Sequence, residues 1–125
     1  MRVLRLLAIA LLTGNFLFFS CCAARAYAHA FPDHSDPRVG ATIHVSPDRV
    51  RIWFDSALES VFSTIMVQSA GDKIADKRDG RVNPSDASLL EVSVPKLPPG
   101  TYRVIWKVVA RDGHRTSGDF TFTIK

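Results

Sequence analysis

Alternation of apolar and polar side chains over residues 101–109 constrains the fold of this chain more than any other feature. With a period of two, successive side chains point to opposite faces of a β-strand. One face then carries Tyr102, Val104, Trp106 and Val108. Arg103 and Lys107 occupy the opposite face. The pattern predicts a strand with one buried and one solvated side.

Further segments carry β-branched or alternating patterns, and turn-forming residues separate them. These segments are residues 49–54, 63–68, 89–94 and 119–124. The turn signals are Ser46-Pro47-Asp48, Asp79-Gly80, Asn83-Pro84 and Leu97-Pro98-Pro99-Gly100. No segment sustains a helical period, and residues 57–62 are expected to supply one helical turn at most. Short strands at this spacing predict an all-β domain, either a β-sandwich or a small Greek-key barrel.

Residues 1–28 have the pattern of a secretory signal peptide. Arg2 and Arg5 form a basic start, residues 6–19 are almost wholly apolar, and Ala26-Tyr27-Ala28 matches the small-x-small site that signal peptidase cleaves. The apolar stretch is about 14 residues, short of the ~20 that a membrane-spanning helix needs. An uncleaved anchor is therefore the less favoured alternative. A lipid on Cys21 is also less favoured, because bulky Phe18 and Phe19 precede that cysteine.

Cleavage after Ala28 would remove 28 of the 125 residues and leave a domain of residues 29–125. Both cysteines, Cys21 and Cys22, lie upstream of the cut, so this domain has neither a disulfide nor a thiolate ligand. Three of the 16 Lys and Arg residues also leave, whereas all 12 acidic residues stay, which gives a formal charge of +1. A nearly neutral surface predicts no nucleic-acid partner and no direct insertion into a membrane after cleavage. The charged residues 72–81 alternate in sign and are expected to form a solvated loop.

The predicted cleavage would make His29 the first residue of the exported protein. Its free α-amine and its imidazole Nδ1 can close a six-membered chelate ring on one metal ion. A second candidate segment is Asp112-Gly113-His114, which follows the longest predicted strand. In extended backbone, residues two apart point to the same side, and Gly113 adds no side chain to crowd an ion. By itself such a segment is more often a turn with a surface histidine than a metal site.

Together these residues offer three nitrogens and one carboxylate oxygen. That donor set suits a tetragonal Cu(II) ion, which stands at the top of the divalent affinity order. Zinc prefers a tetrahedral site, often with thiolate, and the domain has no cysteine. Cu(I) favours soft sulfur, and Met66 is the only methionine beyond residue 28. The sequence predicts one Cu(II) ion per chain, held by His29, Asp112 and His114.

The chain resembles the CopC copper-resistance proteins over essentially all of residues 29–125. The resemblance rests on His29-Ala30-Phe31-Pro32-Asp33-His34, Ser46-Pro47, Trp53-Phe54, Gly100-Thr101-Tyr102-Arg103-Val104-Ile105-Trp106 and Asp112-Gly113-His114 to Gly118. It implies an immunoglobulin-like Greek-key β-barrel in the periplasm, with a Cu(II) site whose ligands map onto His29, Asp112 and His114. It also implies transfer of the ion to a CopD-like copper transporter in the inner membrane.

The chain departs from the best-known CopC proteins in the loop that corresponds to residues 69–86. Those proteins carry a methionine-rich loop that holds Cu(I), whereas residues 69–86 here are charged and contain no methionine. The interpretation is therefore a Cu(II)-only protein without enzymatic activity. Two alternatives stay open: a copper-dependent oxidase or monooxygenase that uses the N-terminal histidine chelate, and a metal-free immunoglobulin-like interaction module.

Other residues near these motifs have simpler expected roles. His34 is a candidate auxiliary ligand, although an exposed loop histidine is the favoured interpretation. His44 is expected on the surface, and Asp55 in a turn. Tyr102, after Pro-Pro-Gly, is a candidate tyrosine corner. Trp53 and Trp106 are expected in the core.

Overall fold

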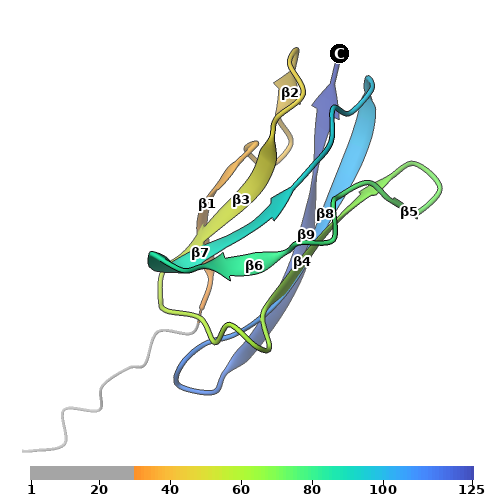
Figure 1. The fold of residues 1–125 in the computed structure, drawn as a ribbon. Helices are drawn as coiled ribbons and strands as arrows, with labels where there is room; N and C mark the ends of the chain where they lie inside the picture. Colours follow the sequence, from red (N-terminus) through yellow and green to blue (C-terminus); the bar gives the residue numbers. More distant parts are fainter. Residues whose placement is uncertain (1–29) are drawn as a thin grey trace, which may run out of the picture.

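Two β-sheets pack face to face in the computed structural model, which describes residues 30–125 (Figure 1). The first sheet has the strand order β1 (Pro32–Asp36), β3 (Arg49–Phe54), β7 (Asp86–Ser93) and β6 (Arg81–Asn83). The second has the order β2 (Thr42–Ile43), β9 (Arg115–Ile124), β8 (Gly100–Val109), β4 (Thr64–Ser69) and β5 (Lys73–Ile74). This all-β sandwich confirms the predicted fold class.

The alternation seen in the sequence decides which side chains enter the space between the sheets. In β3 every second residue is buried, and in β8 the same holds from Tyr102 to Val108. The fully buried side chains at the centre include Ile52, Val104 and Phe122, one from each of three strands. Burial of such side chains is the main favourable term in folding, about 25 cal/mol per Å² of apolar surface.

Packing in the core accounts for the positions of Trp106 and Tyr102 and for the glycine at position 118. Trp106 is 7% exposed and packs edge-on against Phe54, as expected for a core residue. A Cβ at Gly118, on the neighbouring strand β9, would lie 2.6 Å from Trp106 Cζ2, so only glycine fits opposite the indole. The Tyr102 hydroxyl donates a 2.6 Å hydrogen bond to the Pro98 carbonyl, which confirms the predicted tyrosine corner.

Trp53 was expected in the core, and this prediction is wrong. Because Val50, Ile52 and Phe54 of β3 face inward, Trp53 points to the outer face of the four-stranded sheet, where it is half-buried. There its indole stacks on the His34 imidazole, with ring centroids 4.5 Å apart and planes 10° from parallel.

All five predicted strands are present, and the structure has four further short strands that the sequence pattern did not predict. β9 begins at Arg115 and β7 at Asp86, both earlier than expected. The missed strands are β1, β2, β5 and β6. β1 reads Pro-Asp-His-Ser-Asp and contains no apolar alternation, because it is an edge strand with one buried residue, Ser35.

Residues 57–62 form turns and an isolated bridge, so the expected helical turn is absent. The backbone groups bond to strands instead: Leu58 N–H donates to the Ala87 carbonyl at 2.8 Å, and Glu59 N–H to the Val109 carbonyl at 2.8 Å. Residues 72–81 are mostly exposed, as expected of a solvated loop, although they include β5. Within residues 30–125, no helix is long and apolar enough to cross a membrane.

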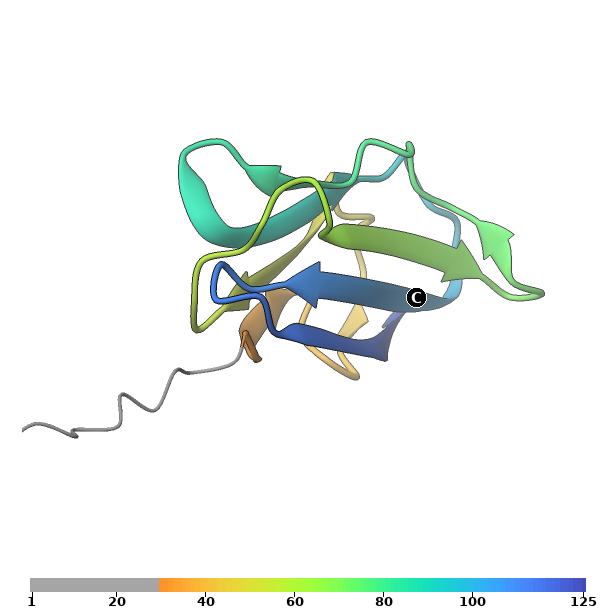
Figure 2. The same cartoon turned by 90° about the horizontal axis from the view of Figure 1, so that it is seen from below.

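One end of the sandwich brings together three segments that are far apart in sequence. The turn between β8 and β9 lies beside the connection from β3 to β4, as the view from below shows (Figure 2). Leu58 pairs with Ala110 across this contact, and Arg111 N–H donates to the Ala57 carbonyl at 3.1 Å. Ala30, the first described residue, joins the same end through a hydrogen bond from β9.

Candidate metal centre

Asp112 and His114 lie in the tight turn between β8 and β9. Gly113 N–H donates to the Ala110 carbonyl at 2.9 Å, and Ala110 N–H donates to the His114 carbonyl at 2.9 Å. Gly113 has φ +92, a conformation that side chains rarely adopt, and nothing lies within 4 Å of a Cβ placed there. Glycine is needed for the backbone conformation. The extended backbone expected for Asp112-Gly113-His114 is wrong, because the segment forms a turn.

The turn nevertheless brings the two predicted ligands together. His114 Nδ1 lies 2.9 Å from Asp112 Oδ2, and the His114 backbone N–H donates to Asp112 Oδ1 at 3.0 Å. The Asp112 side chain is 20% exposed and the His114 side chain 53% exposed. The turn thus places a carboxylate oxygen and an imidazole nitrogen side by side.

The start of the described chain is fixed beside this turn. Ala30 is fully buried, and its carbonyl accepts a 2.6 Å hydrogen bond from the Thr116 hydroxyl, two residues after His114. Phe31 is held by Asp55: its N–H donates to Asp55 Oδ1 at 2.9 Å, and the Asp55 N–H donates to the Phe31 carbonyl at 3.0 Å. Both sheets therefore anchor the segment that follows His29. His29 itself lies outside the described residues.

Asp55 and Thr116 were not recognised as positioning residues in the sequence. Asp55 follows β3 in a bend, in line with the expected turn, but its carboxylate also accepts a hydrogen bond from a residue 24 positions earlier. Thr116 binds a carbonyl 86 positions away. Neither contact leaves a local pattern in the sequence.

His34 makes its described contacts on the outer face of the four-stranded sheet. Its Nδ1 lies 2.8 Å from Asp33 Oδ2, and its ring stacks on Trp53. The auxiliary-ligand role of His34 stays a prediction. His44 is exposed, as expected for a surface residue.

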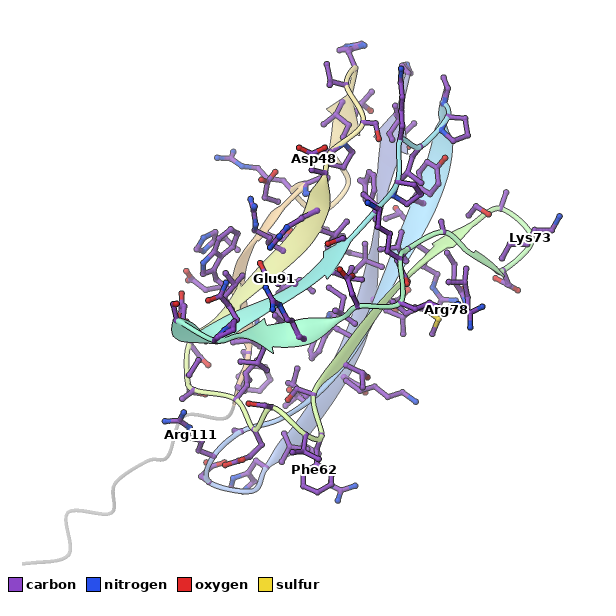
Figure 3. The ribbon with its side chains drawn as sticks, viewed as in Figure 1. Asp48, Phe62, Lys73, Arg78, Glu91 and Arg111 are labelled. Atoms are coloured by element: carbon purple, nitrogen blue, oxygen red, sulfur yellow. The ribbon has the colours of Figure 1, made fainter. Side chains whose placement is uncertain are left out.

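Asp112 and His114 supply two donor side chains. In the part of the chain that the structure describes, no group of three or more His, Cys, Asp and Glu side chains is arranged to hold a metal ion. The neighbouring Arg111 and Arg115 are both exposed (Figure 3 labels Arg111 at this end of the molecule).

Comparisons with known proteins place these features in a family. The family model described as "CopC domain" matches residues 33–125. The protein YobA of Escherichia coli K12 is 31% identical over 119 residues, which covers 94% of this chain and 92% of YobA. Copper resistance protein C of Escherichia coli is 30% identical over 123 residues, covering 93% of this chain and 95% of that protein.

The fold agrees with the same family. The crystal structure of CopC from Methylosinus trichosporium OB3b superposes with a TM-score of 0.72 at 25% sequence identity. The superposition covers 78% of this chain and 94% of that one.

Proposed function

This chain belongs to the CopC family, and on that premise we propose that it is an exported Cu(II)-binding protein that carries or buffers copper. Family membership makes it a copper-related protein. Our proposal adds the oxidation state of the ion, a stoichiometry of one ion per chain, and the ligands His29, Asp112 and His114. The ion is the cargo of this protein.

The hydrogen bond from Thr116 to Ala30 is the observation that carries the proposal. It ties the residue after His29 to the strand that begins one residue after His114. Consecutive Cα atoms are about 3.8 Å apart, so cleavage after Ala28 would create an α-amine and an imidazole at the end of the sandwich that holds Asp112. A protein with a longer N-terminus would lack this amine.

The chemistry of the donors favours Cu(II). The amine and two imidazole nitrogens, completed by one carboxylate oxygen, form the tetragonal nitrogen–oxygen set that this ion prefers. Met66, on β4, is partly buried, and residues 69–86 contain no methionine, so the described chain offers no cluster of thioethers for Cu(I).

A carrier role fits this site better than catalysis. The His114 side chain is 53% exposed at the tip of a hairpin, where an acceptor protein can reach the ion directly. A hard carboxylate ligand also favours Cu(II) over Cu(I), which opposes redox cycling. We propose that the protein acts in copper resistance or homeostasis and passes the ion to a CopD-like transporter in the inner membrane.

Location in the periplasm is part of the same proposal. It follows from the predicted signal peptide, residues 1–28, with cleavage after Ala28, and it leaves residues 29–125 as the copper-binding β-domain. No cysteine remains in that domain, so its stability in an oxidising compartment depends on the apolar core.

The test is to determine the N-terminus of the exported protein by intact mass and then to titrate the same sample with Cu(II), read by EPR. A terminus at His29 with one equivalent of a tetragonal, nitrogen-rich signal would support the proposal. A terminus elsewhere, or no tight signal, would overturn it. Robust ascorbate- or peroxide-driven oxidation of a substrate would replace the carrier role by an enzymatic one.

A further inference from the structure

Two neighbouring apolar side chains stand in solvent at the end of the sandwich that holds Asp112 and His114. Val61 is 82% exposed and Phe62 is 65% exposed, both in the turn that precedes β4. Figure 3 labels Phe62 next to the hairpin formed by β8 and β9. Adjacent exposed apolar side chains of this kind form a candidate contact site for another molecule.

Phe62 forms one wall of a shallow groove of about 420 Å³. The partly exposed Val109 of β8 adds apolar surface, and the cations Lys107 and Arg115 lie along its sides. The residues that line this groove, all in the described part of the chain, include no Asp or Glu. The groove is therefore apolar at its base and positive at its rim.

The groove lies at the end of the sandwich that carries Asp112 and His114. Thr116 lines the groove and also donates the hydrogen bond to Ala30, and Arg115 directly follows His114. In a direct transfer of Cu(II) between two proteins, donor atoms of the acceptor have to reach the ion. A protein that exchanges copper with this chain must therefore approach this end of the sandwich.

We propose that this groove is the docking surface for the protein that exchanges copper with this chain, and that this partner inserts an apolar side chain flanked by carboxylates. The inference rests on the proposed copper function. Apolar contact supplies affinity, while the positive rim steers an acidic partner and excludes a basic one. This surface thus selects which proteins and chelators gain access to the ion.

Charge also distinguishes this partner from two other possible occupants of the groove, a second copy of the chain and an uncleaved leader. A second copy of the chain, in a symmetric pair, would bring its own Lys107 and Arg115 against the same cations. An uncleaved leader carries Arg2, Arg5 and Arg25 and no acidic residue. Both occupants would place like charges together, whereas an acidic partner would not.

The experiment measures copper transfer from the exported protein to two synthetic peptides. Both begin with the Cu(II)-chelating sequence Gly-Gly-His and a flexible spacer. One ends in Asp-Leu-Phe-Asp-Glu and the other in Lys-Leu-Phe-Lys-Lys. We expect the acidic peptide to accept copper about 10-fold faster at low ionic strength, and the ratio to approach one in high salt. Equal rates for the two peptides would overturn the proposal.

Three variants test whether the preference for the acidic peptide comes from the groove. Lys107→Glu should remove most of the preference for the acidic peptide, whereas Lys73→Glu, with the same charge change on distant β5, should keep it. Phe62→Ser should slow transfer to the acidic peptide without changing copper affinity in a direct titration. If Lys73→Glu acts as strongly as Lys107→Glu, the preference comes from net charge, and the docking surface is refuted.

Further measurements separate this inference from the proposed function and from the other occupants. If the protein binds no copper, the metal-free protein is titrated with the acidic tail lacking Gly-Gly-His. Amide shifts confined to Phe62, Thr64 and Lys107 would support the groove, and their absence would refute it. A dimer in sedimentation that Phe62→Ser dissociates, or shifts of these amides caused by an uncleaved leader, would assign the groove to that occupant instead.

Discussion

The hydroxyl of Thr116 donates a 2.6 Å hydrogen bond to the carbonyl oxygen of Ala30, across 86 residues of sequence. Ala30 is fully buried, so this carbonyl depends on a protein partner. The contact fixes the start of the domain to β9, beside the turn that carries Asp112 and His114. It makes Thr116 a positioning residue for the proposed copper site, because it touches the chain next to His29.

Replacing Thr116 by valine keeps the shape of the side chain and removes the donor. The buried Ala30 carbonyl then loses its partner, which should lower the free energy of unfolding by about 1–3 kcal/mol. Copper affinity should fall about 10-fold, at the low end of the roughly 10–100-fold loss for an outer partner of a metal ligand, because Thr116 holds the residue next to His29. Thr121→Val, on the same strand with an exposed side chain, is the matched control and should leave affinity unchanged. Equal affinity in both variants would remove Thr116 from the copper site.

The ligand variants should differ from each other in copper affinity. His29→Ala removes the imidazole and with it the chelate ring, so we expect a loss of more than about 100-fold, beyond the 10–100-fold typical of outer partners. His114→Ala removes one donor and should cost less. Isothermal titration with Cu(II) in competition with a chelator of known affinity measures both. Small and equal losses would contradict the proposed geometry.

Copper binding should weaken as the pH falls. The ion needs a neutral imidazole and a deprotonated amine, and an α-amine has a reference pKa of about 7.7–8.0. Protons therefore compete for the donors in acid, and we expect release of the ion below about pH 6 with uptake of protons. EPR at a series of pH values follows the release. Affinity that does not change between pH 8 and pH 5 would exclude the amine as a ligand.

Gly118→Ala tests the packing of the sandwich separately from the site. The added Cβ would lie 2.6 Å from Trp106 Cζ2, and the buried indole cannot move without disturbing the core. Such overpacking typically costs about 1–3 kcal/mol. Thermal unfolding of this variant and of the exposed neighbour Ser117→Ala gives the comparison. A stability equal to wild type would show that the indole adjusts freely.

Tyr102→Phe probes the corner where the hydroxyl bonds to Pro98. Loss of that bond should cost about 1 kcal/mol at neutral pH. Burial raises the pKa of Tyr102 above its ordinary value of 10.0, so the folded state favours the neutral phenol. That stability is present below pH 10 and is lost as the pH rises through the folded pKa. Urea unfolding at several alkaline pH values should show a weaker loss of stability in Tyr102→Phe than in wild type. Identical slopes would exclude Tyr102 as the group responsible.

The sequence predicted the long strands because each carries its own alternation. In residues 49–54 and 101–109, apolar and polar side chains alternate visibly in the sequence, and these residues form β3 and β8. The short strands β1 and β5 exist because a neighbouring strand offers hydrogen-bonding partners, and their own residues show no pattern. Trp53 is strongly apolar, but its position between the inward-facing Ile52 and Phe54 turns its side chain to the outer face of the sheet.

By itself the sequence determined the fold class, the local pair Asp112 and His114, and the tyrosine corner, since each depends on residues near one another in the chain. Tertiary structure alone decided that Thr116 holds Ala30, that Asp55 holds Phe31, and that Phe62 shares a groove with Lys107. Each of these contacts joins residues that are far apart in the sequence and lie on different strands or connections. Local periodicity carries no information about such pairings, because they are fixed only when the two sheets close over one core.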